Sequence, residues 1–313
     1  MKTVLGIDLG GTKILIGELT LEGEVLQSKR YPSIVTSQRE AIDTVKKSLK
    51  DFLETTKLYG DVQAIGIGLV GRVDRDNGIW IEIHPGLSQQ IDVAKEIKET
   101  FGYPCYLGND VYCATLAEQT YGIGLLTKHF IYMNIGTGIA AGCVVNGKIL
   151  EGANFDAGEI GHMVVDFNSK IPCLCGRTGC VEVLASGLGM HNRAITLLEQ
   201  YPDSCINAQQ SGRITAKQLF NGYDQNDPLC KEIVDTALKA VAATLMNLIR
   251  VTDPTAIVLG GGVVDEWFIH HLSTYMNQKT IRFIRHGISK TTLEAKTLGL
   301  RGAALLASNN KER

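Results

Sequence analysis

The stretch that decides the fold is VLGIDLGGTKILIG, residues 4–17. It reads as an apolar strand, a turn of glycine and threonine, and a second apolar strand, and this pattern predicts a β-hairpin. The stretch FIYMNIGTGIAAGCVV, residues 130–145, repeats the same plan. The two stretches lie about 126 residues apart, which is too long for a solenoid repeat. This interval predicts a duplicated domain.

Helices and short strands are predicted after each hairpin. Apolar residues recur at helical spacing in residues 40–57 and again in residues 232–250, which predicts two helices with one buried face each. Shorter apolar runs at residues 62–67, 105–107 and 256–259 predict strands. Strands that alternate with helices in this way place the chain in the α/β class.

The chain length suggests two domains. A chain of 313 residues is about twice the usual length of one domain. No low-complexity linker marks the boundary, so we place it near residue 120. We expect an N-terminal domain of residues 1–120 and a C-terminal domain of residues 121–295. A C-terminal helix, at about residues 296–313, is expected to return to the first domain.

The composition excludes several classes of protein. Hydrophobic residues make up 44% of the chain and charged residues only 20%, so a disordered or coiled-coil protein is excluded. The net charge is −2 and no long run of like charge is present, so the sequence lacks the electrostatic signature of a nucleic-acid-binding protein. The 34 glycines are well above average usage, which indicates many tight turns or close approaches of backbone to a ligand.

The sequence also indicates a cellular compartment. The N-terminus has no apolar signal-peptide stretch, and the most apolar segment, residues 130–145, is interrupted by Asn134 and several glycines, so no membrane span is predicted. Three of the eight cysteines cluster at positions 173, 175 and 180, and the others are scattered. A chain of this kind without a secretion signal predicts a reduced, cytoplasmic protein.

Asp8 and the glycines that follow it form the first candidate site. Gly10 and Gly11 free successive backbone amides to point at phosphate oxygens, and Thr12 adds a hydroxyl donor. Asp8, at the end of the strand, can hold a Mg²⁺-bound water that bridges the phosphates. The alternative is an ordinary hairpin turn with an exposed aspartate.

Two further glycine clusters favour the phosphate-binding interpretation. Gly136-Thr137-Gly138 occupies the turn of the second hairpin, so one ligand can be held between two such turns. Gly260, Gly261 and Gly262 follow an apolar strand and would let the backbone approach a flat group such as adenine. The alternative for this last cluster is a tight strand-to-helix turn.

One motif is misleading. Residues 66–71, GIGLVG, match the dinucleotide-binding pattern G-x-G-x-x-G after a strand. That pattern binds a dinucleotide only where a helix begins at the turn. The next residues, RVDRDNG at 72–78, predict a turn and not a helix, which disfavours a nicotinamide-dependent enzyme.

Cys173, Cys175 and Cys180, with His162 eleven positions before the first of them, form the strongest local signal. Three thiolates and one imidazole complete the tetrahedral shell of a structural zinc ion. Two glycines between the cysteines allow the sharp turns that bring the sulfurs together. The alternative is three buried free cysteines.

Two glutamates accompany this candidate zinc site. Glu159 lies three residues before His162, and Glu182 lies two residues after Cys180. A bound metal would fix both loops, so the carboxylates would be held rigidly against a polyhydroxylated ligand. Spacing alone leaves a surface glutamate and a helix-capping glutamate as equal alternatives.

Asn109 and Asp110 follow a predicted strand and precede an expected helix at residues 111–121. Such a pair is a natural helix cap. The functional alternative makes Asp110 a general base that accepts the proton of an attacking hydroxyl. Because a helix N-terminus lowers the pKa of an aspartate, we expect Asp110 to be ionised and a weak base, which suffices for phosphoryl transfer.

Taken together, these motifs resemble those of the ROK family of sugar kinases and related regulators. The resemblance runs from GIDLGGTK at residues 6–13 to LGLRGAA at residues 298–304, and its most specific parts are EIGH at residues 159–162 and the cysteine cluster that continues to Glu182. It implies two actin-like ATPase (ribonuclease H-like) domains with a cleft between them. It also implies a homodimeric kinase that uses ATP and Mg²⁺ to phosphorylate the 6-hydroxyl of a hexose or N-acetylhexosamine, and that contains structural zinc.

The resemblance also assigns roles to residues. Asp110 would be the catalytic base, and His162 would use one ring nitrogen for the metal and the other for the sugar. The sugar-binding residues would be Gly71, Asn109, Asp110, Glu159, His162 and Glu182. The ATP-binding residues would be Asp8, Gly10, Gly11, Thr12, Lys13, Thr137, Gly138, Gly261 and Gly262. The zinc ligands would be His162, Cys173, Cys175 and Cys180.

Three departures from the family pattern leave the sugar open. Gly71-Arg72 stands where many members carry Pro-Gly, and the arginine resembles what N-acetylmannosamine kinases show there. Residues 83–87, IHPGL, lack the asparagine often found in the sugar-contacting loop, and Ala140 and Ala141 stand where glycines are more usual.

The alternative within the same family is a non-catalytic sugar-sensing regulator. The transcription factors of the family carry a helix-turn-helix domain before the phosphate loop, whereas only seven residues precede Asp8 here. We therefore expect a sugar and ATP as partners, and neither nucleic acid nor a membrane.

Overall fold

The computed structural model of the chain consists of two compact units. Unit 1 contains Met1–Gly122, Glu151–Ala157 and Leu293–Arg313, and unit 2 contains Ile123–Leu150 and Gly158–Thr292. The structure describes residues 1–11, 13–84, 86, 88–207 and 212–309. Thr12, a predicted ATP-binding residue, lies outside the described residues. That the chain folds as two independent domains with limits at residues 120 and 295 stays a prediction.

Unit 1 is built on a five-stranded sheet in which three antiparallel strands are followed by two parallel ones. In spatial order the strands are β3 (Val25–Pro32), β2 (Lys13–Thr20), β1 (Lys2–Leu9), β4 (Asp61–Leu69) and β8 (Cys105–Asn109). β2 pairs antiparallel with β1 and β3, whereas β4 is parallel to both β1 and β8. The predicted hairpin at residues 4–17 is therefore confirmed.

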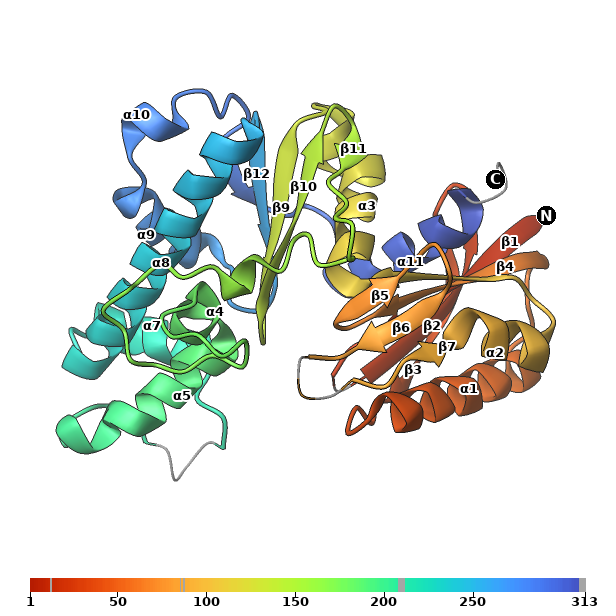
Figure 1. Cartoon of the computed structure of the whole chain (residues 1–313), viewed down its shortest axis with the longest axis horizontal. Coiled ribbons are helices and arrows are strands. Elements are labelled where there is room, and N and C mark those ends of the chain that lie inside the picture. The colour runs from red at the N-terminus through yellow and green to blue at the C-terminus, as the bar shows by residue number, and fades with distance from the viewer. Residues whose placement is uncertain (12, 85, 87, 208–211, 310–313) are drawn as a thin grey trace. The chain divides into compact units, whose positions relative to one another are not determined.

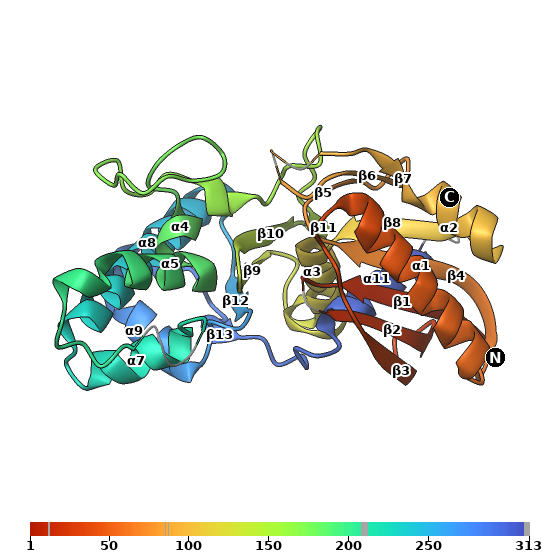
Figure 2. The ribbon, with the colours of Figure 1, turned by 90° about the horizontal axis from the view of Figure 1, so that it is seen from below.

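Helices cover both faces of this sheet (Figure 1 and Figure 2). They are α1 (Gln38–Thr55), α2 (Val93–Phe101), α3 (Asp110–Tyr121) and α11 (Leu298–Asn309), and a small antiparallel sheet contains β5 (Arg72–Asp74), β6 (Ile79–Glu82) and β7 (Ile91–Asp92). Side chains alternate between the faces of a strand, so Ile7 packs in the cluster that includes Ile42 of α1, while Val4 packs with Leu300 of α11.

The glycines of the misleading 66–71 motif have a packing role. A Cβ atom at Gly66 would lie 1.8 Å from the carbonyl oxygen of Ala303 in α11, so only glycine lets this helix lie directly on β4. Gly71 adopts a left-handed conformation with φ 82°. The chain continues from Gly71 into β5 and then a turn, not into a helix, so no dinucleotide-binding turn is formed there.

Unit 2 repeats the same sheet order. Its strands are β11 (Lys148–Ile149), β10 (Ile139–Val145), β9 (Phe130–Ile135), β12 (Ala256–Gly260) and β13 (Ile288–Lys290), again in spatial order. β10 is antiparallel to β9 and β11, and β12 is parallel to β9 and β13. This correspondence with unit 1 confirms the duplication that the two hairpins predict.

Helices of unit 2 pack on its sheet around one large apolar core, and Figure 2 shows α5, α7 and α8 on one side of the strands. The helices, with three 3₁₀ turns, are η1 (Ile123–Leu125), η2 (Ile160–His162), α4 (Val181–Ala185), α5 (Gly187–Leu197), η3 (Leu198–Gln200), α7 (Ala216–Asp224), α8 (Pro228–Thr252), α9 (Glu266–Tyr275) and α10 (Gln278–Ile281). α8 begins where Asp227 caps it and Pro228 occupies its first turn.

In the described part of the chain, no helix combines the length and apolar character needed to cross a membrane.

Candidate functional site

In unit 1, the predicted site residues gather at the carboxyl ends of three parallel strands. Asp8 of β1 is in register with Gly68 of β4, and Gly68 is in register with Gly108 of β8. Asp110 follows β8 immediately as the first residue of α3. Ligands of open α/β sheets bind at this edge, so the sheet places both aspartates where a ligand would meet them.

Asp110 is half-buried, and the Oδ1 atom of its carboxylate accepts a hydrogen bond from the amide of Val111 at 2.9 Å. Burial raises the pKa of Asp110 to about 6, and the negative charge of Asp8 adds to that shift. The backbone amide of Val111 at the helix N-terminus does lower this pKa, as expected. The expected low pKa of Asp110 is nevertheless wrong, because loss of solvent and the charge of a second carboxylate outweigh the helix end. At neutral pH Asp110 is still mostly ionised, and it is a stronger base than an exposed aspartate.

Asn109 caps α3 and also holds the turn at Gly71. Its Oδ1 atom accepts hydrogen bonds from the amides of Val111 and Tyr112, at 2.8 Å and 3.1 Å. Its Nδ2 group donates to the carbonyl oxygen of Gly71 at 2.8 Å. The helix-cap interpretation is confirmed for Asn109, and the same side chain joins two of the predicted sugar-binding positions.

Asp8 has the environment of a cation ligand. Burial raises its pKa, and the positive charge of Lys13, the first residue of β2, partly offsets that rise. Among the described residues, none donates a hydrogen bond to its carboxylate. Beside it, Gly11 has no atom within 4 Å of the place where a Cβ would be. The amide of Gly10 donates a hydrogen bond to the carbonyl oxygen of Lys13 at 2.9 Å, which closes the turn. A half-buried carboxylate that accepts no hydrogen bond from the described residues fits Mg²⁺, which prefers carboxylate and water oxygens.

In unit 2, two glycine turns follow parallel strands in the same manner. Gly136-Thr137-Gly138 follows β9, and Gly261 and Gly262 follow β12, which pairs with β9. Gly261 has φ 96°, and a Cβ there would lie 2.3 Å from the carbonyl oxygen of Ile135. Gly262 faces open space. The second turn is therefore open at Gly262, where a ligand could approach the backbone.

Glu182 has a contact that its spacing does not predict. It lies in the first turn of α4, and its Oε2 atom accepts a hydrogen bond from the amide of Ile139 at 2.9 Å. A Cβ atom at Gly138 would lie 2.5 Å from the same oxygen. Glu182 therefore supports the Gly136–Gly138 turn, so the segment that follows the cysteine cluster is connected to a predicted phosphate-binding loop.

Glu159 lies directly before η2, between the glycine turn of β10 and the cysteine cluster. Its neighbour Gly158 pairs with Ala141 of β10, whose amide donates to the Gly158 carbonyl at 2.9 Å. Gly158 has φ 101°, and a Cβ there would lie 2.3 Å from the Ala141 carbonyl oxygen. Glycine is thus required at 158 to bring Glu159 alongside β10, a constraint that the sequence pattern did not reveal.

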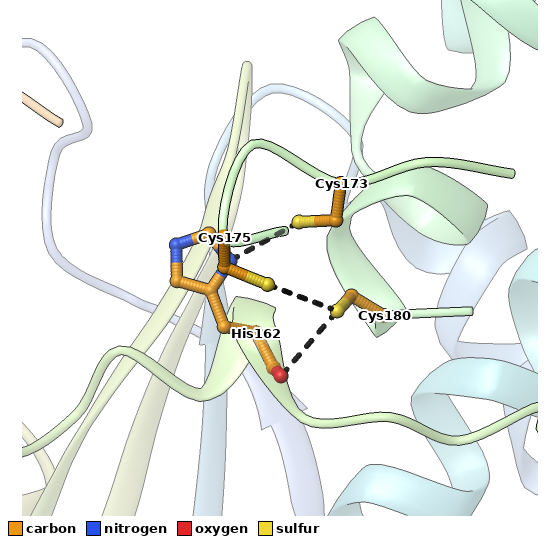
Figure 3. A group of neighbouring side chains, drawn as sticks. All are labelled: His162, Cys173, Cys175 and Cys180. Carbon is orange, nitrogen blue, oxygen red and sulfur yellow. Dashed lines mark hydrogen bonds between the residues drawn. The ribbon is translucent and has the colours of Figure 1, made fainter. Parts of the chain in front are cut away.

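His162, Cys173, Cys175 and Cys180 converge on one point (Figure 3), and their ligand atoms all lie within 4.8 Å of one another. The Nδ1 atom of His162 lies 3.3 Å from Sγ of Cys173, and Sγ of Cys175 lies 3.6 Å from Sγ of Cys180. Gly176 and Gly179, with φ 84° and 71°, form the turns between the cysteines. The other ring nitrogen of His162 points away from the sulfurs (Figure 3).

These distances fit a tetrahedral metal. With Zn–S bonds of about 2.3 Å, the sulfurs of a tetrahedral zinc site lie about 3.8 Å apart. Burial raises the pKa of Cys173, whereas hydrogen bonds from Arg177 outweigh burial at Cys175 and lower its pKa to about 6. A thiol that ionises easily, beside two others and an imidazole, has the donor chemistry of a structural zinc site.

Comparison with known proteins identifies the family. A ROK family profile matches residues 4–310. A glucokinase of Halalkalibacterium halodurans is 31% identical over 267 residues, covering 83% of this chain and 80% of the relative. An N-acetylmannosamine kinase of Escherichia coli is 28% identical over 316 residues, covering 99% of each. A xylose repressor of Caldicellulosiruptor bescii is 24% identical over 318 residues, covering 98% of this chain and 78% of the relative.

A solved structure confirms the fold class. The ROK family glucokinase of Streptomyces griseus, in complex with glucose and AMPPNP, superposes on this chain with a TM-score of 0.78 at 25% identity, covering 98% of this chain and 100% of that one. The two sheets of like order thus form the actin-like ATPase fold that the sequence predicts. With a profile match over nearly its whole length and this shared fold, the chain belongs to the ROK family.

Proposed function

We propose that this chain is an ATP- and Mg²⁺-dependent kinase that phosphorylates the 6-hydroxyl of a hexose or N-acetylhexosamine, with Asp110 as the general base. The observation that carries the proposal is the pair Asp8 and Asp110 at one sheet edge, where Asp8 raises the pKa of Asp110 and lacks a hydrogen-bond donor among the described residues. Two carboxylates in different environments suit two roles in phosphoryl transfer, proton acceptance and cation binding.

Asp110 would act on the sugar hydroxyl. An ionised carboxylate held at the start of α3 accepts the proton as the O–P bond forms. Asn109 fixes this position because its side chain caps the same helix and holds the Gly71 carbonyl. The proposed sugar ligands are Gly71, Asn109, Glu159, His162 and Glu182, and they would position the hydroxyl by hydrogen bonds and not by covalent chemistry.

The glycine turns would bind the nucleotide. Backbone amides of Gly11 and Gly138, with the side chains of Lys13, Thr12 and Thr137, are proposed to face the phosphates, and Gly261 and Gly262 the adenosine. Gly10 would shape the phosphate-binding turn, because its own amide donates to the carbonyl of Lys13. Mg²⁺, when bound, neutralises phosphate charge. Asp8 would hold it through its carboxylate, whose position is fixed by β1.

We also propose that His162, Cys173, Cys175 and Cys180 bind one structural zinc ion. The ion would fix Cys180 and the start of α4, and thereby Glu182 and the turn that Glu182 supports. Elemental analysis should find about one zinc per chain. Cys175→Ser should lose most of that zinc and lower activity. Cys205→Ser should keep both, although this exposed cysteine belongs with Asp227 and Cys230 to a second group of potential metal ligands. A folded, active wild type without zinc would contradict this assignment.

The test of the kinase is sugar-dependent ADP release from Mg-ATP. The panel is glucose, mannose, fructose, allose, N-acetylglucosamine and N-acetylmannosamine, with Asp110→Asn as the matched control. A rate with at least one sugar that Asp110→Asn lowers by about 10²-fold or more supports the proposal. Turnover that Asp110→Asn retains would remove Asp110 as the base, and no turnover with any sugar would contradict the activity.

A second candidate is a sugar-sensing regulator without catalysis, which the similarity to the xylose repressor favours. Sugar binding by calorimetry without ATP, in a wild type that shows no turnover, would support it. We further propose that the protein is a cytoplasmic homodimer, because this is the usual state of kinases in the family. Light scattering tests the mass, which should be about twice that of the 34.0 kDa chain.

A further inference from the structure

One segment crosses from unit 2 to unit 1 and back. Residues Glu151–Ala157, which we name the crossing segment, lie in sequence between β11 and η2, both in unit 2, but they pack in unit 1. The chain returns to unit 2 at Gly158, directly before Glu159. The contacts that hold the crossing segment therefore fix the point at which the chain leaves unit 1, just before the proposed sugar ligand Glu159.

Arg75 makes the contacts that hold this segment. It lies in the turn between β5 and β6, and its Nη2 atom lies 3.0 Å from Oε1 of Glu151. The hydroxyl of Tyr112, in the first turn of α3, donates to the same Oε1 atom at 3.1 Å. The Arg75 guanidinium also stacks 3.7 Å from the centre of the Tyr112 ring. Only 17% of the Arg75 side chain is exposed, whereas 54% of the Glu151 side chain is. The ion pair therefore reaches the surface on the Glu151 side, and the stacking of the buried guanidinium on Tyr112 adds to it.

The backbone of the crossing segment is strained. Phe155 has φ 57°, in the left-handed region that a bulky side chain rarely adopts. Such a conformation persists where surrounding contacts over-determine it. The Phe155 ring lies 5.9 Å from the Arg75 guanidinium, so Arg75 touches the crossing segment at its first residue and approaches it again at its strained one.

The crossing segment is one wall of a cavity of about 340 Å³. The remaining lining residues are Arg72, Ile81 and Gln90, and the crossing segment contributes residues 153–156. Arg72 directly follows Gly71, whose carbonyl is held by Asn109. The cavity thus adjoins the turn where the proposed sugar site lies.

We propose that Arg75 is a positioning residue of the sugar site. It clamps the crossing segment, which lines a subsite for the part of the sugar nearest Gly71. The charge of Arg72 in this subsite is paired with Glu82, at 3.3 Å, and Asp156 is the other charged residue of its lining. The subsite therefore suits a substituent that donates hydrogen bonds. This inference rests on the proposed function.

Two measurements on Arg75→Ala test the clamp. Amide hydrogen exchange of residues 151–157 should become about tenfold faster without any ligand, because a lost stacked ion pair corresponds to about that factor. In steady-state kinetics, KM for the sugar should rise about tenfold, while kcat and KM for ATP stay within about twofold. Glu151→Gln, which removes the charge but not the packing, should change both in the same direction and less.

Arg39→Ala is the matched control. Arg39 also pairs with a carboxylate in unit 1, Glu96 at 2.9 Å, but it lies on α1 and makes no contact with the crossing segment. It should leave exchange of residues 151–157 and all kinetic constants unchanged.

The outcomes separate this inference from the proposed function. Unchanged exchange in Arg75→Ala, or equal losses in kcat and in KM for both substrates, would overturn the positioning role. If the wild type neither binds nor phosphorylates any sugar, the proposed function and the sugar subsite are wrong, and the exchange data alone decide whether Arg75 is a clamp.

Discussion

At the residue scale, the acidity of Asp110 governs the pH dependence of the proposed reaction. Its pKa is raised to about 6 by burial and by Asp8, and only the ionised form accepts a proton. We therefore expect kcat to rise with pH through about 6 and to be level above it. Asp110→Asn should lower kcat by about 10²–10⁴-fold. A pH profile of kcat with the preferred sugar measures both.

The control for this profile is the residual rate of Asp110→Asn, which should lack the acidic limb. A wild-type rate that is level between pH 5 and 7 would show that another group limits the reaction. Neutralisation of Asp8 by a bound cation would shift the limb toward lower pH, because part of the raised pKa comes from the Asp8 charge.

The same raised pKa has a consequence for stability. A carboxyl whose pKa is higher in the folded state than the usual 3.8 favours folding while it is protonated, and this stability is lost as pH rises through about 6. Asp110→Asn removes the penalty, so at pH 7 it should be more stable than the wild type by about 1–2 kcal/mol. Below about pH 4 both states of the wild type are protonated, and the difference should vanish.

Urea unfolding of both proteins at pH 7 and pH 4 measures this difference. If Asp110→Asn is destabilised equally at both values, the side chain acts through its hydrogen bond to Val111 and not through its charge. A carboxylate that is kept for function lowers the stability of the folded protein. We therefore expect the inactive Asp110→Asn variant to be more stable than the wild type at neutral pH.

The identity of the important residues could be predicted from the sequence, but their electrostatics could not. Their positions at the ends of predicted strands indicated Asp8 and Asp110 as site residues. The Asn-Asp pair predicted the helix cap that Asn109 forms. The pKa of Asp110 was predicted in the wrong direction, because its burial and its proximity to Asp8 depend on β1, β4 and β8 lying side by side.

At the scale of elements, the start of α11 is packed against Asp8. A Cβ atom at Gly299 would lie 2.7 Å from Cγ of Asp8 and 2.8 Å from its Oδ2 atom. Gly299→Ala should therefore displace the carboxylate. We expect kcat to fall about 10–100-fold, as for other misplacements of this size, and the Mg²⁺ concentration for half-maximal rate to rise. Titration of the rate with Mg²⁺ measures this effect.

Gly302→Ala is the control within the same helix. Its Cβ would meet the carbonyl oxygen of Cys113 at 1.9 Å, so it should lower the stability of unit 1 without a specific change in Mg²⁺ dependence. Equal Mg²⁺ requirements for Gly299→Ala and the wild type would refute a role for α11 in placing Asp8.

Regular elements could be predicted because their patterns are local. The hairpins and the helices at residues 40–57 and 232–250 follow from spacing, and the structure has them as β1–β2, β9–β10, α1 and α8. The small β5–β6–β7 sheet was missed, since its strands have only two to four residues and leave no periodicity. Gly299 and Gly158 were missed because each is required by a contact distant in sequence.

At the scale of the whole molecule, the duplication could be predicted and the path between the units could not. Two glycine turns in like hairpins were enough to predict a duplicated domain, and the structure has two sheets of the same order. The crossing segment has no regular pattern, so nothing in its residues shows that Glu151 packs with Arg75 and Tyr112 of unit 1.

The charge of the whole chain separates the two functions that its relatives suggest. With 31 basic and 33 acidic residues, the net charge is −2, and non-specific affinity for DNA comes from neutralising phosphates with Lys and Arg. We expect no binding to a 30-base-pair duplex at 150 mM salt up to about 50 µM protein. Fluorescence anisotropy with and without the panel sugars measures this, and serum albumin and a DNA-binding protein of known affinity serve as controls. Saturable DNA binding that a sugar weakens would favour the regulator over the kinase, because sugar-dependent DNA binding is a property of a regulator and plays no part in phosphoryl transfer.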